Sequence, residues 1–314
     1  MALPFFSIDL KSYDLIKILT SIILPINKKK IEYKFIKILK SRFPNNYISI
    51  LPSARLGFYL TLKNYFKEGD EIIFSSMSFP LYIKIANQLN LKVILVDVDK
   101  STFNINHLEI ESKITPKTKG IVATHLFGYP CKISEISEIA KKYNLRLIED
   151  CAQSFNSFYG QRETGTFGDV GIFSTSLLKI PTTLSGGILI TKDKELSLTI
   201  ENWCKDNLKN NLSINLKLLI KNILSILNSY PLIYSILSDK IFSFLNNYNP
   251  RIYRKILYSG MGVSSEKFDP LERPPLKKYQ LVSGICQLER CQEMNDLRKK
   301  NSLALIESLK DIKN

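Results

Sequence analysis

Two kinds of hydrophobic pattern alternate along the chain. Short continuous apolar runs, typical of buried parallel strands, are separated by stretches with apolar residues at helical spacing. The alternation predicts a three-layer α/β/α fold with a mainly parallel sheet covered on both faces. We expect strands at Tyr47–Leu51, Glu71–Ser75, Lys92–Asp97, Gly120–Thr124, Arg146–Ile148 and Val170–Phe173. We expect helices at Ile31–Phe43, from about Leu56 onwards, at Leu81–Leu89 and at Lys132–Tyr143.

Polar residues follow two of these apolar runs. The run Arg146–Ile148 leads to Asp150, and the run Val170–Phe173 leads through Ser174 to Lys179. The carboxyl ends of parallel strands meet at one edge of a sheet, and open α/β folds bind their ligands there. We therefore expect a carboxylate, a hydroxyl and an amine to lie together at that edge.

These groups match what pyridoxal 5'-phosphate (PLP) requires of a protein. A carboxylate beside the pyridine nitrogen keeps it protonated, so that the ring can withdraw electrons from a carbanion on the substrate. Asp150 suits that role. Lys179 suits the second role, which is to bind the cofactor aldehyde covalently and then to move a proton between carbon atoms. The chain has 44 Lys and Arg residues, so a single lysine carries no signal outside this context.

The order of three motifs points to one family. EDCAQ at Glu149–Gln153 is followed by GTFGDVGIFSTSLLK at Gly165–Lys179 and then by Gly186-Gly187. This succession resembles the signature of the DegT/StrS family of PLP-dependent sugar aminotransferases, which have fold type I of the aspartate aminotransferase superfamily. Lys179 follows Asp150 by 29 residues, the spacing of that family. The resemblance runs from about residue 45 to about residue 200 and resumes more weakly near residue 274.

The resemblance implies a phosphate-binding site at Ser53, Ala54 and Arg55. Ser53 suits a helix N-cap, and the next two backbone N–H groups would then point at an anion. Taken alone, the stretch fits an ordinary capped helix equally well. The family has Thr where this chain has Arg55, whose charge either supplements or disturbs the binding of the phosphate.

Three further cofactor contacts are implied by the same resemblance. Phe79 falls where the family stacks an aromatic residue on the PLP ring, although an aromatic residue near a strand end is more often part of a core. Gln153 matches a residue that contacts the ring hydroxyl, and Ser174 matches one that contacts the phosphate. His125 lies near the active-site edge or a dimer contact if it is functional, but a structural role is the preferred interpretation.

The chain also departs from the family. Ser176 stands where His is common, and Ser185 stands where Glu is usual before the Gly-Gly pair. Arg273 falls at the place of an Asn that reaches the phosphate of the neighbouring subunit. The cofactor residues are therefore retained while groups on the substrate side differ, which predicts a changed substrate specificity.

Composition changes after the motif region. The stretch from Asn207 to about Tyr258 is rich in Leu, Ile, Asn and Ser and is longer than in the family, with two amphipathic helices expected on either side of Pro231. Residues 212–246 either contact an anionic membrane or, in the preferred interpretation, pack against the large domain or a partner subunit. We expect a PLP-binding large domain at 1–205, an apolar helical insertion at 206–272 and the start of a small domain at 273–314. Typical family members continue for roughly a hundred residues more, so the small domain is expected to be largely missing.

Composition excludes several classes of protein. The net charge of +15 would attract anions or an acidic membrane surface, but a compositional bias toward Lys, Asn and Ile explains it as well. No nucleic-acid-binding motif accompanies the charge.

Five Cys without a CxxC pair and two His support neither a metal site nor a disulfide framework. The apolar run at the start is too short for a secretory signal, so a cytoplasmic location is the default, with membrane association as an open alternative.

The sequence thus predicts an aminotransferase. The amino group would pass from glutamate or a similar donor to a keto group of a nucleotide-activated sugar, in polysaccharide or deoxyaminosugar biosynthesis, and the enzyme would be a homodimer. Lys179 and Asp150 would be the catalytic residues. Some relatives in the family that dehydrate sugars have His at the position of the Lys, so the presence of Lys179 favours amino transfer. The alternative is a non-catalytic PLP-binding or membrane-docked regulatory protein. The sugar, the nucleotide and the carbon that is aminated stay open.

Overall fold

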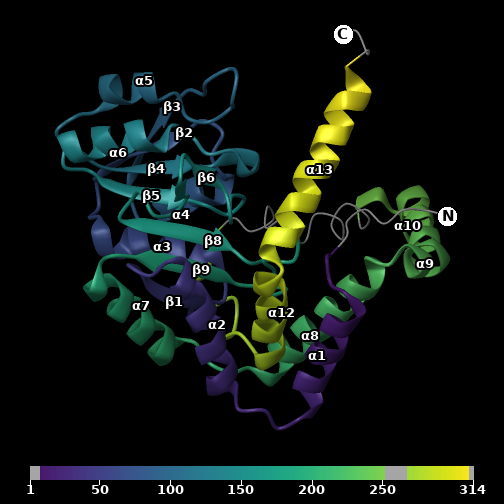
Figure 1. Cartoon of the computed structure of the whole chain (residues 1–314). Helices are drawn as coiled ribbons and strands as arrows, with labels where there is room; N and C mark the ends of the chain where they lie inside the picture. Colours follow the sequence, from purple (N-terminus) through teal and green to yellow (C-terminus); the bar gives the residue numbers. More distant parts are fainter. Residues whose placement is uncertain (1–7, 252–266, 311–314) are drawn as a thin grey trace.

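A seven-stranded sheet forms the centre of the molecule in the computed structural model, which describes residues 8–251 and 267–310 (Figure 1). Its strands are β1 (Tyr47–Leu51), β2 (Glu71–Ser75), β3 (Lys92–Val96), β4 (Thr118–Thr124), β5 (Arg146–Asp150), β8 (Val170–Ser174) and β9 (Gly187–Thr191). Their spatial order is β1-β9-β8-β5-β4-β2-β3. Only β9 runs against its neighbours, because it pairs antiparallel with both β1 and β8. The predicted mainly parallel sheet is confirmed.

Helices cover both faces of this sheet. Those up to residue 142 are α1 (Ser12–Ile23), α2 (Lys28–Arg42), α3 (Ala54–Tyr65), α4 (Pro80–Gln88), α5 (His107–Ile110), η1 (Glu111–Lys113), η2 (Leu126–Gly128) and α6 (Ile133–Lys142). Those after residue 193 are α7 (Lys194–Asn207), α8 (Leu212–Asn228), α9 (Pro231–Ile233), η3 (Tyr234–Ser238), α10 (Asp239–Tyr248), α12 (Lys278–Glu289) and α13 (Cys291–Leu309). A short hairpin of β6 (Phe158–Tyr159) and β7 (Arg162–Glu163) precedes β8.

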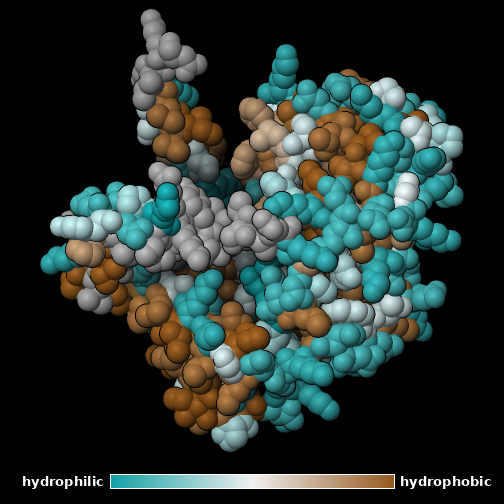
Figure 2. All heavy atoms as spheres, turned by 180° about the vertical axis from the view of Figure 1, so that it is seen from behind, coloured by the Kyte–Doolittle hydropathy of each residue, from teal (hydrophilic) through white to brown (hydrophobic). Residues whose placement is uncertain are grey.

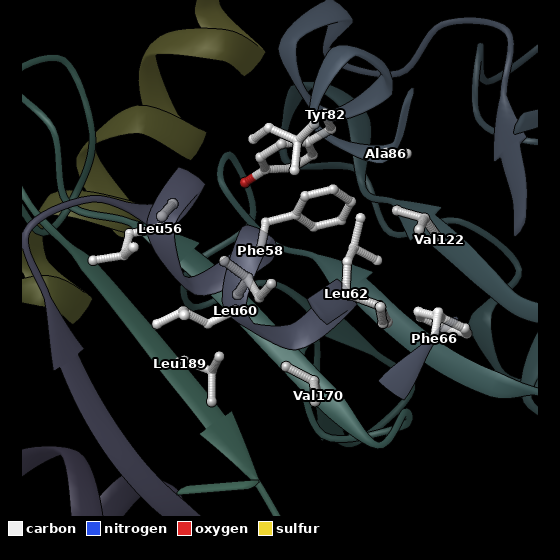
Figure 3. Packing of buried hydrophobic residues seen from close by; sticks show 14 of the residues in the cluster. Leu56, Phe58, Leu60, Leu62, Phe66, Tyr82, Ala86, Val122, Val170 and Leu189 are labelled. Carbon is white, nitrogen blue, oxygen red and sulfur yellow. The ribbon is translucent and has the colours of Figure 1, made fainter. Parts of the chain in front are cut away.

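Alternating side chains of the strands fill separate cores on the two faces. Ile72 of β2 packs in the cluster that contains α3, α4 and α7, whereas its neighbour Ile73 packs in the cluster that contains α6. Figure 3 shows the first cluster, in which the rings of Phe58 and Tyr82 stack with centroids 4.0 Å apart. Burial of each such side chain contributes about 1.5–3 kcal/mol. The two cores hold the sheet between its helical layers and fix the edge where β4, β5 and β8 end.

The predicted elements match the observed ones with small shifts. The strand predicted at Arg146–Ile148 continues to Asp150, so this carboxylate belongs to β5 itself. The helix predicted from about Leu56 begins at Ala54 instead. The reason is local, because the Ser53 hydroxyl accepts the N–H of Leu56 at 3.2 Å and so caps the helix earlier.

The predicted insertion is helical in its described part. Its helices α8 and α10 lie on either side of Pro231, as predicted, while residues 252–266 lie outside the described residues. One side of α8 packs on the molecule, where Ile226 is buried and the Asn222 amide donates to the Tyr279 hydroxyl at 3.2 Å. Nowhere in the described ranges is a helix both long and apolar enough to cross a bilayer. The division of the chain at residues 205 and 272 stays a prediction.

Candidate active site

Asp150 ends β5 at the carboxyl edge of the sheet. It pairs in register with Thr124 of β4 and with Ile172 of β8. Its side chain is buried, and one carboxylate oxygen accepts the N–H of Ala152 at 3.1 Å. Burial raises the pKa of Asp150, although the Ala152 N–H and the nearby His125 and Lys179 oppose the rise. The sheet therefore holds a carboxylate where a cationic partner would be strongly favoured.

Lys179 lies after β8 and faces the same edge. Burial lowers the pKa of this partly buried lysine, and the charge of Asp150 partly offsets the effect. The two groups thus lie close enough to influence each other, yet they form no ion pair in the described part of the chain. A turn holds the lysine in place, since its backbone N–H donates to the carbonyl of Ser176 at 2.9 Å. The arrangement provides an amine of lowered basicity beside a buried carboxylate.

Glu149 connects the EDCAQ motif to the glycine-containing loop before β8. Its fully buried carboxylate accepts the N–H of Gly165 at 2.7 Å and the N–H of Gly168 at 2.7 Å. It also bonds Nε2 of His125 at 3.1 Å, and Nδ1 of that ring accepts the N–H of Cys131. The end of β5 is thereby tied to the loop that enters β8. His125 is fully buried in this network, as expected for a structural residue, and it lies near Asp150 at the active edge.

The beginning of α3 lies against β9 next to Ser174. A Cβ on Gly187 would lie 2.4 Å from the nitrogen of Ala54, so only glycine allows this approach. Gly187 pairs with Ser174 in the sheet, which brings that hydroxyl near the helix start. Since the first N–H groups of a helix lack partners within it, those of Ala54 and Arg55 are available to an anion. The predicted cap at Ser53 is confirmed, and the residues predicted to bind phosphate come together.

The Arg55 side chain, in contrast, has a partner in the protein. Its Nη2 contacts Oε1 of Glu272 at 2.5 Å, and the same oxygen lies 3.4 Å from Nε of Arg273. Burial lowers the pKa of Arg273, and the charge of Arg55 lowers it further. The guanidinium of Arg55 is therefore held by Glu272, while its backbone belongs to the helix start.

Phe79 and Gln153 are two further residues that the sequence predicted at the carboxyl edge of the sheet. Phe79 precedes α4, is 36% exposed and meets Tyr82 edge-on at 5.6 Å, so it does not belong to the buried core. The Gln153 side chain is exposed, and its carbonyl accepts the N–H of Phe127 at 2.8 Å. The amide nitrogen of Gln153 makes no hydrogen bond to any described residue. Both side chains thus keep a surface available to a ligand.

Three residues that the sequence did not single out also lie here. The hydroxyls of Ser78 and Thr124 are buried after β2 and at the end of β4. That of Ser78 has no hydrogen-bond partner among the described residues, and that of Thr124 lies near Asp150 and lowers the pKa of its carboxyl group. Burial raises the pKa of Tyr82, and the charge of Asp150 raises it further, which places its hydroxyl near that carboxylate. Position at a strand end was the only signal for Ser78 and Thr124. Nothing in the sequence distinguished Tyr82 from an ordinary core residue.

Comparison with known proteins identifies the family. The sequence model of the DegT/DnrJ/EryC1/StrS aminotransferase family matches residues 38–213 of this chain. The chain belongs to this family. The match covers the sheet, the Asp150 and Lys179 positions and α7, so the site described above lies within the region that defines the DegT/DnrJ/EryC1/StrS aminotransferases.

One similar curated protein is the GDP-perosamine synthase of Escherichia coli O157:H7, with 42% identity over 129 residues. The match spans 41% of this chain and 35% of that protein. Another is the dTDP-3-amino-3,6-dideoxy-alpha-D-galactopyranose transaminase of Aneurinibacillus thermoaerophilus, with 39% identity over 41% of this chain and 36% of that protein. The chain thus matches little more than a third of the length of either relative.

The fold is also found in solved structures. The Escherichia coli GDP-4-keto-6-deoxy-D-mannose-3-dehydratase with bound hydrated PLP aligns with a TM-score of 0.72 and 19% identity. The alignment covers 99% of this chain and 74% of the dehydratase. At this identity the likeness establishes the fold, a fold type I arrangement in agreement with the prediction.

Proposed function

We propose that this chain is a PLP-dependent aminotransferase that moves an amino group from glutamate, or a similar donor, to a keto group of a nucleotide-activated sugar. The observation that carries the proposal is the meeting of the buried Asp150 carboxylate and the Lys179 amine at the carboxyl edge of the sheet. The substrate class is supported by the two curated relatives, which are named as a GDP-perosamine synthase and a dTDP-amino-sugar transaminase.

The residues at the edge fit PLP. The buried hydroxyl of Ser78 has no hydrogen-bond partner among the described residues and is available to a ligand. The carboxylate of Asp150 is buried beside a single backbone donor, as expected for a group that meets a cationic ring nitrogen. Gly187 leaves room for the start of α3, whose free N–H groups favour a phosphate. When bound, PLP supplies a carbonyl for amino groups and a ring that stabilises negative charge on the substrate carbon.

Each residue then has a defined task. Lys179 holds the cofactor, and its lowered pKa leaves the amine able to take a proton from one carbon and return it to another. Asp150 keeps the ring nitrogen protonated, and Phe79 packs on the ring. Gln153 donates its free amide N–H to the ring hydroxyl.

The phosphate is assigned to the start of α3. Ser53, the backbone N–H groups of Ala54 and Arg55, and the Ser174 hydroxyl bind it. The closeness of Ser174 and α3, which Gly187 permits, supports this assignment. The charge of Arg55 is balanced by Glu272, so the helix start rather than the guanidinium provides the attraction.

We propose further that the enzyme is a homodimer that works in the cytoplasm, in the biosynthesis of polysaccharide or deoxyaminosugars, with a peripheral membrane contact through residues 212–246. The large domain would comprise residues 1–205, with the insertion at 206–272 and the start of a small domain at 273–314. The exposed apolar side chains of α8 support the membrane contact.

Amino transfer by the full chain tests the proposed reaction. The PLP-loaded protein is incubated with L-glutamate and a panel of GDP- and dTDP-linked keto sugars, and mass spectrometry detects the amino sugar. We expect turnover by the natural chain and by Lys192→Ala, an exposed lysine after β9, but a loss of at least a thousandfold in Lys179→Ala. A chain that binds PLP but does not react with amino donors would overturn the proposal and favour a regulatory protein.

A further inference from the structure

A continuous apolar surface lies on α1 and α8, which run side by side at the end of the molecule away from α5 (Figure 1). Both helices line one apolar groove, with Leu19 and Ile223 on its two sides. The outward side chains on either side of the groove are large and apolar, which Figure 2 shows as a brown area. We name this surface the α1–α8 face and define it by Ile16, Leu19, Ile23, Leu216, Ile220 and Ile223.

The side chains that define this face are exposed. Ile23 is 80% exposed and Leu216 is 55% exposed, although both are aliphatic. Their neighbours on the inner side of the same helices, Ile18 and Ile226, are buried. Each helix is therefore apolar on both its inner and its outer side. A contiguous exposed apolar patch of this kind marks a binding surface rather than ordinary solvent-exposed residues.

Exposed charge on the two helices themselves is of one sign. α8 contains Lys217 and Lys221 but neither Asp nor Glu. The single acidic residue of α1, Asp14, is fully buried and bonds Arg290 at 2.7 Å. The exposed charges on these two helices are thus all positive, including that of Lys17.

A cluster of lysines lies at the base of the face. The exposed Lys28, Lys29 and Lys30 begin α2, directly after the apolar turn that follows Ile23. Two more lysines come from the start of α12. Nζ of Lys278 donates to the carbonyl of Leu24 at 2.6 Å, and burial together with the charge of Lys28 lowers the pKa of Lys277. Five lysines thus surround the exposed end of α1.

These features decide between a second copy and a membrane. A second copy docked through this face would bring no exposed carboxylate on α1 or α8 to pair with these lysines. An anionic phospholipid surface satisfies both features, because apolar side chains enter the acyl boundary while lysines meet the headgroups. No described helix can cross the bilayer, so the helices would lie along it. α13 carries the chain away from this end (Figure 1).

We propose that the α1–α8 face docks on the surface of an anionic phospholipid bilayer. The inference extends the membrane contact proposed for 212–246 to α1 and to the lysine cluster at its base. It is independent of the proposed amino transfer, since no residue of the face belongs to the edge that holds Asp150 and Lys179. Vesicle binding and turnover can therefore succeed or fail separately.

Sedimentation with vesicles tests the proposal. The full chain is mixed with vesicles of equal parts phosphatidylglycerol and phosphatidylcholine, or of phosphatidylcholine alone, and the bound fraction is measured against lipid concentration. The test variant combines Ile23→Glu with Leu216→Glu. The control variant combines Leu108→Glu with Leu95→Glu, because these side chains are 78% and 50% exposed on α5 and β3. All four positions are exposed, so folding is expected to persist, and circular dichroism checks it.

We expect binding to the anionic vesicles to fall at least tenfold in the Ile23/Leu216 variant and to change less than twofold in the control. Binding should also weaken in 0.5 M salt and be weak on phosphatidylcholine. Equal binding by both variants, or no binding by the natural chain, overturns the proposal. Light scattering tests whether a second copy of the chain covers this face instead. If the natural chain is a dimer and the Ile23→Glu, Leu216→Glu variant is a monomer, the face is a dimer interface and the proposal is overturned.

Discussion

At the scale of single residues, the site depends on the protonation of Asp150 and Lys179. Burial shifts the two pKa values in opposite directions, raising that of the carboxyl group and lowering that of the amine. Both shifts disfavour the charged form of the group, and the charge of each group partly offsets the pKa shift of the other. A cationic ring nitrogen beside Asp150 would provide the positive charge that stabilises the ionised carboxylate.

Replacing Asp150 by Asn separates stability from function. Because the pKa of Asp150 is raised in the folded chain, its ionisation lowers the free energy of unfolding as the pH rises through that pKa. Asp150→Asn should therefore raise the free energy of unfolding at pH 7 by about 1 kcal/mol, and the gain should disappear below the ordinary carboxyl pKa of about 3.9. Urea denaturation at both pH values measures this. A loss of stability at pH 7, or retained amino transfer, would contradict the assigned role.

The reactivity of Lys179 should follow its pKa. Burial lowers that pKa below 10.5, so the rate of PLP capture should level off at a lower pH than it does for an exposed lysine. Asp150→Asn removes the charge that stabilises the ammonium, so the midpoint should move lower still. Stopped-flow absorbance between pH 6 and pH 10 gives both midpoints. A midpoint that rises in Asp150→Asn would show that the two groups do not interact as described.

At the scale of elements, the start of α3 depends on its contact with β9. Gly187 touches Ala54 so closely that any side chain must displace the helix start. We expect Gly187→Ala to lower the free energy of unfolding by about 2 kcal/mol, typical of overpacking, and to weaken PLP binding at least tenfold.

Pyridoxal, which lacks the phosphate, provides the control for this substitution. Its affinity should change less than threefold, because the displaced helix start is proposed to bind the phosphate alone. Fluorescence titration with both ligands measures the two affinities. An equal loss for pyridoxal and PLP would contradict the assignment of the phosphate to α3.

Most elements of the fold follow from the hydrophobic pattern, because β2, β4 and β5 are buried on both faces and read as apolar runs. The direction of β9 does not, since an apolar run is the same for either direction. The structural role of Glu149 could not be predicted from the sequence either, because its carboxylate accepts two backbone N–H groups from a loop that is distant in the sequence. Motif spacing found Asp150 and Lys179, but it gave no sign of Ser78, whose buried hydroxyl has no partner among the described residues.

At the scale of the whole molecule, the active edge and the α1–α8 face are separate features. The edge is built from β4, β5, β8 and α3, whereas the face is built from helices outside the sheet. A protein docked through the α1–α8 face would keep the site near the membrane without using any of its residues for binding. The sequence pattern predicted the apolar stretch after Asn207, but it did not predict the exposed apolar side of α1. Which side chains of α1 are buried and which are exposed becomes visible only in the folded chain.

Covalent trapping tests the central claim most directly, namely that Lys179 is the amine that holds PLP beside Asp150. The full chain is loaded with PLP, reduced with borohydride and digested, and mass spectrometry locates the modified lysine. We expect one pyridoxyl group on Lys179, with none in Lys179→Ala and full labelling in Lys192→Ala. Stoichiometric labelling of a different lysine, or undiminished labelling of Lys179→Ala, would contradict it.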